Sequence, residues 1–242
     1  MKYPLLCLVA LVLFSCKKEE KKEVQIPQKE VQANVETDEN APDVPDTLKI
    51  KYDEHKNLFT ILTILPDSSF SSWEWPKNDR IELVNKVKKN NYIVATRFLW
   101  KYSLITPNAL QIAVVDGSWV LSIYKVKTNN YIVLAENRVG DGSTFRAFEY
   151  ENGQLTAIPF NDLFDHSTTE LLIDPDDEKC MEYFNDNRLL FDYSYIGTKK
   201  IKVHNYYLEE YKDCFKGNTM NYEFDPAAKM FKLINIEFSS EK

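Results

Sequence analysis

Short β-prone runs separated by tight-turn signals occupy the chain from residue 110 onward, and this pattern constrains the fold most. The turn signals include Asp-Gly, Asn-Gly and Gly-Thr pairs, whose Asn and Gly residues supply the positive φ angles that two-residue hairpins require. We therefore predict a mainly β fold: an antiparallel meander forming a sandwich, a barrel or partial propeller-like sheets, with one or two short helices. The predicted strands are 110–115, 118–127, 131–139, 145–151, 155–158, 189–196, 200–208, 220–224 and 230–238.

Two segments are candidates for these helices. Segment 161–173 lies between the two groups of strands and is expected to form a short helix. In segment 78–87 the apolar residues fit a helical period, although three of them also alternate as in a strand; we predict the helix.

A partial repeat bears on the same region. Segment 87–94 closely matches segment 126–133, and their spacing of 39 residues (126 minus 87) is near the length of one propeller blade. Chance similarity within a tyrosine-rich β protein explains the match equally well.

The N-terminal segment predicts export. Residues 1–15 carry one lysine and then an uncharged apolar run from Leu5 to Phe14. A run of about ten residues fits the core of a secretory signal, and it is shorter than the roughly 20 residues that span a bilayer.

The sequence Leu13-Phe14-Ser15-Cys16 resembles the lipobox of bacterial lipoproteins, although Phe14 replaces the small residue more usual at its position. The resemblance implies cleavage before Cys16 and attachment of lipid to its sulfur, which anchors the chain in a membrane. Lys17-Lys18-Glu19-Glu20 is similar to signals that send some lipoproteins to the cell surface. The resemblance implies an outer-membrane lipoprotein of the cell envelope, facing the periplasm or the surface.

The region after Cys16 is expected to be a tether. Residues 16–47 are polar and charged and contain three prolines but no aromatic residue, so they cannot bury enough apolar surface to fold. We therefore expect the globular domain to span 48–242, with two sub-halves that meet near 160–180.

Charge argues against nucleic-acid binding. The chain has a formal net charge of −7, and its one basic cluster, Lys199-Lys200-Lys202, fits the solvated face of a strand. No Gly-rich phosphate loop, nucleophile elbow or zinc-binding histidine motif is present in the sequence. We accordingly predict no cofactor.

Two cysteines remain in the predicted mature domain, Cys180 and Cys214. In an oxidising envelope an even pair most simply forms a disulfide, with two buried thiols as the alternative. Nearby, Asp174, Asp176, Asp177 and Glu178 form a carboxylate-rich loop. Such a loop is a weak candidate for calcium, but it lacks the glycine and the terminal glutamate of an EF-hand, and a solvated turn is the favoured interpretation.

Trp73 and Trp75 flank a single residue and would project to the same side of an extended segment. Exposed together, they would form a platform for a sugar ring or a partner's side chain. The favoured alternative places both at the edge of the core.

We conclude that the sequence favours a membrane-anchored, non-enzymatic binding module of the inhibitor, immunity or assembly-accessory type, with a protein partner or a glycan. The competing hypothesis is a lipoprotein that binds or hydrolyses carbohydrate or peptidoglycan.

Overall fold

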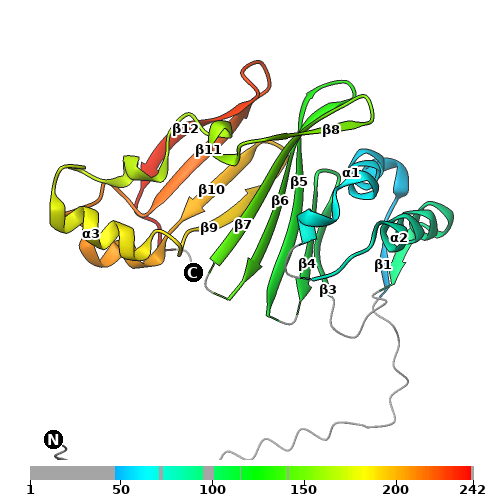
Figure 1. The fold of residues 1–242 in the computed structure, drawn as a ribbon, viewed down its shortest axis with the longest axis horizontal. Coiled ribbons are helices and arrows are strands. Elements are labelled where there is room, and N and C mark those ends of the chain that lie inside the picture. Colours follow the sequence, from blue (N-terminus) through cyan, green and yellow to red (C-terminus); the bar gives the residue numbers. More distant parts are fainter. Residues whose placement is uncertain (1–46, 71–72, 95–100, 115, 141, 241–242) are drawn as a thin grey trace, which may run out of the picture. The chain divides into compact units, whose positions relative to one another are not determined.

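The computed structural model describes residues 47–240 apart from 71–72, 95–100, 115 and 141 (Figure 1). The predictions for residues 1–46, including lipidation of Cys16, lie outside the described residues.

The described residues form a mainly β fold with two antiparallel meanders, as the turn signals predict. The first is a six-stranded sheet in the order β3-β4-β5-β6-β7-β8, and the second is a four-stranded sheet in the order β12-β11-β10-β9. Neither sheet closes into a barrel, and a short pair, β1-β2, adds a third sheet. The strands are β1 Thr47–Lys49, β2 Tyr92–Val94, β3 Lys101–Thr106, β4 Ala109–Val114, β5 Gly117–Lys127, β6 Asn130–Val139, β7 Gly142–Glu151, β8 Gln154–Ile158, β9 Asp192–Ile196, β10 Lys200–His204, β11 Thr219–Asp225 and β12 Met230–Glu237.

Local turn chemistry accounts for the hairpins. Asn152 and Gly153 both have positive φ, 49° and 92°, in the two-residue turn between β7 and β8. Gly117 serves a different purpose, because it opens β5 and an added Cβ would lie 1.8 Å from the carbonyl oxygen of Arg138. This glycine is therefore needed for the close approach of β5 to β6.

Helix α2 (Lys77–Asn90) confirms the helical prediction for 78–87, and it ends where Asn91 adopts the left-handed conformation. Two further α-helices were not predicted, α1 (Tyr52–Ile64) and α3 (Glu178–Asn187). The described residues also contain the 3-10 helices η1 Asp67–Phe70, η2 Phe160–Leu163, η3 Thr168–Leu171 and η4 Tyr206–Tyr211.

The predicted helix at 161–173 is wrong, because η2 and η3 are separate turns joined by extended backbone. Between them, Phe164 pairs with Phe231 of β12, and the Asp165 carboxylate accepts a hydrogen bond from Leu233 N at 2.9 Å. These bonds to β12 replace helical ones, and they also cover part of the edge of the four-stranded sheet.

The partial repeat does not form two equivalent units. Segment 87–94 contains the end of α2 followed by β2, whereas segment 126–133 forms the hairpin between β5 and β6. The propeller alternative is therefore excluded for this pair of segments.

The six-stranded sheet is buried on both faces. On β6, Val133 packs in a first core with Leu58 and Phe59 of α1. Its neighbours Ile132 and Leu134 pack in a second core with side chains of the four-stranded sheet. The two sheets therefore share the second core instead of folding around separate ones.

Candidate interaction surface

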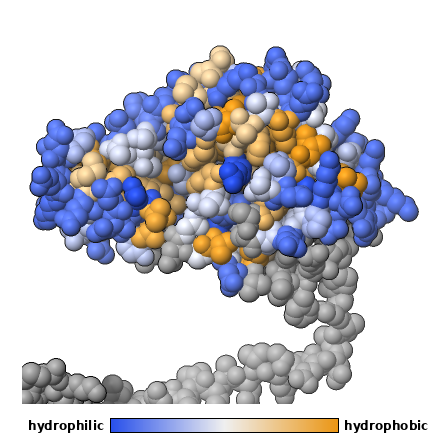
Figure 2. Space-filling view, in the orientation of Figure 1, coloured by the Kyte–Doolittle hydropathy of each residue, from blue (hydrophilic) through white to orange (hydrophobic). Residues whose placement is uncertain are grey.

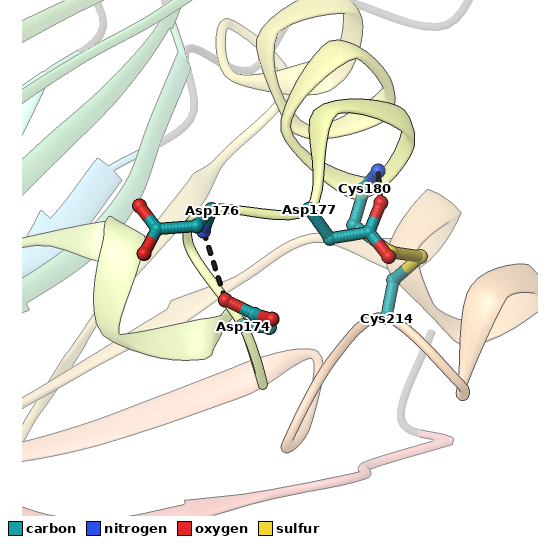
Figure 3. Close-up of a disulfide and its surroundings, with 5 residues drawn as sticks. All are labelled: Asp174, Asp176, Asp177, Cys180 and Cys214. Atoms are coloured by element: carbon teal, nitrogen blue, oxygen red, sulfur yellow. Dashed lines mark hydrogen bonds between the residues drawn. A yellow bond between two sulfur atoms is a disulfide. The ribbon is translucent and has the colours of Figure 1, made fainter.

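A disulfide joins Cys180 and Cys214, as predicted (Figure 3). Cys180 lies in the first turn of α3, where its backbone N–H donates to the Asp177 carboxylate at 3.1 Å. Cys214 follows η4 closely in sequence, and its N–H donates to Tyr211 O. The bond therefore fixes the segment that carries η4 to α3.

The acidic loop before α3 serves backbone structure. Asp174 Oδ1 accepts a hydrogen bond from Asp176 N at 2.9 Å, and Asp177 caps α3. In Figure 3 the carboxylates of Asp176 and Asp177 point away from each other. Among the described residues, no three His, Cys, Asp or Glu side chains are grouped to hold a metal ion. The weak calcium candidate, which comprised Asp174, Asp176, Asp177 and Glu178, is therefore not grouped as a set of metal ligands in the structure.

Trp73 and Trp75, the candidates for a ligand platform, both lie against the first core. Trp75 is only 4% exposed, and Trp73 packs beside it with ring centroids 5.2 Å apart. Both indoles also contact Trp119 of β5 edge to face. The structure thus agrees with the core alternative, because Trp75 presents no open face to a ligand.

Four exposed side chains form what we call the apolar patch: Leu189, Tyr206, Tyr207 and Tyr211. Leu189 is 72% exposed and Tyr207 is 51% exposed. Leu189, Tyr206 and Tyr207 line one shallow cavity of about 230 Å³. On the face shown in Figure 2, hydrophobic surface is interspersed with hydrophilic side chains, so exposed apolar groups occur in several places. The apolar patch stands out because tyrosines supply three of its four members.

Hydrogen bonds from Asn205 and Tyr183 hold the apolar patch in place. Asn205 is fully buried; its Oδ1 accepts from Tyr207 N at 3.0 Å and its Nδ2 donates to Asn187 O at 2.9 Å. The hydroxyl of Tyr183, on α3, donates to Tyr207 O at 2.9 Å, and its ring contacts that of Tyr211. Together with the disulfide, these contacts preorganise η4 on α3.

Beside the patch lies a buried charged cluster centred on Glu136 of β6. Its carboxylate accepts hydrogen bonds from Arg138 at 3.0 Å, Ser143 at 2.7 Å and Tyr195 at 2.8 Å. Burial, reinforced by the charge of Glu136, raises the pKa of Tyr195 well above its ordinary value. Because Tyr195 lies on β9, the cluster fastens the six-stranded sheet to the four-stranded sheet.

Arg138 extends this cluster to the surface. Its guanidinium lies 3.3 Å from the Asp192 carboxylate and donates to Tyr193 O at 3.2 Å. Arg138 and Asp192 line the same cavity as Leu189 and Tyr207. The apolar patch is therefore bordered by an ion pair, an arrangement of apolar centre and polar margin that is usual at protein interfaces.

The patch residues were not identified from the sequence. We predicted a strand over 200–208, but β10 ends at His204 and the tyrosines lie in η4. A sequence signal was present in the Tyr206-Tyr207 pair followed by Tyr211, three aromatic residues within six positions.

Comparisons with protein-family models and with curated proteins find no match for this chain. Among solved structures, the chain is similar to a domain of an uncharacterized protein from Porphyromonas gingivalis W83. The sequences are 8% identical, the TM-score is 0.49, and the alignment covers 74% of this chain and 96% of that chain. In the part of the chain that the structure describes, none of the helices has the length and apolarity needed to cross a membrane.

Proposed function

We propose that this chain is a cell-envelope lipoprotein, anchored in the outer membrane through Cys16, whose globular domain is a non-enzymatic binding module for a protein partner. The anchor is supported by the lipobox resemblance of Leu13-Phe14-Ser15-Cys16 and by the polar composition of 16–47. The observation that carries the binding role is the preorganised apolar patch.

The patch has the chemistry of a protein interface. Tyrosine supplies large contact areas at low conformational-entropy cost and is enriched where proteins bind each other. Because Asn205 and the disulfide already order η4, binding would not have to order this segment. An inhibitor, immunity or assembly-accessory role requires such a surface.

Site-specific photo-crosslinking tests the binding role in intact envelopes. A photoreactive amino acid at position 207 or 189 is expected to capture one defined protein, whereas the same residue at Ile234, 60% exposed on β12, should not. Adding Tyr206→Arg should abolish the crosslink at 207. Equal capture from position 234, or no capture from either patch position, would refute the role of the patch.

Anchoring is tested separately. Cys16→Ser should release the protein from the membrane fraction, and intact-mass analysis of the wild-type chain should find acyl groups on a polypeptide that begins at Cys16. An unmodified thiol at position 16 in the native host would contradict the anchor without affecting the crosslinking result.

A further inference from the structure

We propose a second binding site, independent of the apolar patch: the cavity between η2, η3 and the four-stranded sheet binds one neutral sugar ring. We call this cavity the aromatic cleft. It has a volume of about 290 Å³ and is lined by Tyr193, Val203 and Tyr222 of the sheet and by Phe160 and Phe164 of the connecting segment.

The aromatic side chains of the cleft are held by contacts behind them. The Phe160 ring stacks on Phe145 at 4.2 Å, with an angle of 14° between the planes. The Phe164 ring stacks on Phe231 at 5.2 Å and meets Tyr222 edge to face at 5.0 Å. These rings cannot collapse into the cleft without breaking those contacts, so the apolar lining is preformed.

Hydrogen-bonding groups are present both inside the cleft and at its rim. Among the described residues the Tyr193 hydroxyl has no hydrogen-bond partner, and burial raises its pKa, so it remains a protonated donor at neutral pH. The Tyr222 hydroxyl donates to His166 O at 2.9 Å. Asn161, His166, Ser167 and Thr168 complete the lining.

The aromatic rings and the hydrogen-bonding groups of the cleft together indicate the chemical class of the ligand. The lining contains no carboxylate and no Lys or Arg side chain, and the His166 ring lies 3.5 Å from the Glu170 carboxylate. Aromatic faces pack against apolar C–H surface, while the amide and hydroxyl groups match a ligand edge that carries hydroxyls. A neutral pyranose has both features, whereas a purely apolar ligand would leave the polar groups unpaired.

The size of the cleft limits how much of a glycan it holds. Its volume lies near the lower end of the range of about 300–1,000 Å³ for ligand sites, which fits one ring. Asn161, His166 and Ser167 are exposed, so the remainder of a longer glycan would extend into solvent past these residues.

Nuclear magnetic resonance titration of the full mature chain tests the proposal, with the signals of residues 48–242 as the readout. The probes are glucose, galactose and N-acetylglucosamine, each up to about 50 mM, since contacts to a single ring support only weak affinity. We expect saturable shifts of the Ser167 and Thr168 amide signals with at least one sugar. No saturable shift with any of the three would overturn the proposal.

Two variants locate the site. Tyr193→Phe removes only the hydroxyl and Asn161→Ala changes an exposed side chain, so both should fold; each is expected to weaken binding about fivefold, the effect of one lost hydrogen bond. Tyr52→Phe and Asn235→Ala, the matched controls outside the cleft, should stay within about twofold of wild type. Unchanged affinity in both cleft variants, or tighter binding of indole or glucuronate than of any neutral sugar, would refute the assignment.

Discussion

Removing the disulfide should lower stability by an amount that follows from its position in the chain. The Cys180–Cys214 bond spans a sequence separation of 34 residues. On the chain-entropy account, closing a loop of this length stabilises the fold by about 4 kcal/mol. For a domain of this size each kcal/mol corresponds to roughly 2–4 °C, so the double variant Cys180→Ala/Cys214→Ala should melt about 8–16 °C lower.

Calorimetry measures this shift, and a reducing agent provides the control. Wild type with a thiol reductant should melt as the double variant does, and the reductant should not affect the variant. A difference under about 3 °C between wild type and variant would refute the reasoning, because it would mean that the bond does not restrict the unfolded chain. In the variant we also expect faster amide exchange in η4, since one of its attachments to α3 is lost.

Three further predictions concern other buried or paired groups. Arg80→Met should cost about 2–5 kcal/mol in urea unfolding, because the fully buried guanidinium donates to two backbone carbonyls; a cost below about 1 kcal/mol would contradict this. Gly117→Ala should destabilise by about 1–3 kcal/mol and speed amide exchange at the adjoining ends of β5 and β6, because its Cβ would collide with Arg138 O; unchanged exchange would argue against the collision. A hydrogen bond from Lys229, and to a smaller extent one from Asn130, lowers the pKa of Glu149 below its ordinary value of 4.5. The ionised carboxylate therefore stabilises the folded state above pH 4.5, and this stabilisation is lost as the pH falls through the folded-state pKa. Lys229→Met should therefore be less stable than wild type at pH 7 but nearly equal to it once Glu149 is protonated in both; a difference that persists at low pH would have another cause.

Hairpins were predictable from the sequence because their determinants are local. Asn152-Gly153 selects its turn within two residues, and the alternating strands beside it carry their own pattern. The disulfide was likewise predictable from the count of cysteines and the expected compartment.

Other features depend on contacts between distant residues. Neither α1 nor α3 was identified, and segment 161–173 was assigned to a helix because nothing local reveals the bonds of Asp165 to β12. The sequence did not determine whether Trp73 and Trp75 are exposed or buried, because their burial depends on contacts with Trp119 of β5, a residue distant in the chain. The apolar patch depends on where the chain leaves β10, a boundary that local propensity did not fix.

The odd-numbered side chains of β6 pack in the first core and the even-numbered ones in the second core. Neither half of the domain is therefore expected to fold by itself. A fragment ending near residue 160 would leave Ile132 and Leu134, each 1% exposed in the whole domain, in contact with water. The complementary fragment would lose Tyr124 of β5, against which Phe224 and Phe231 pack. Truncation is therefore expected to yield aggregation-prone pieces, and dissection of this protein is better attempted by point substitution.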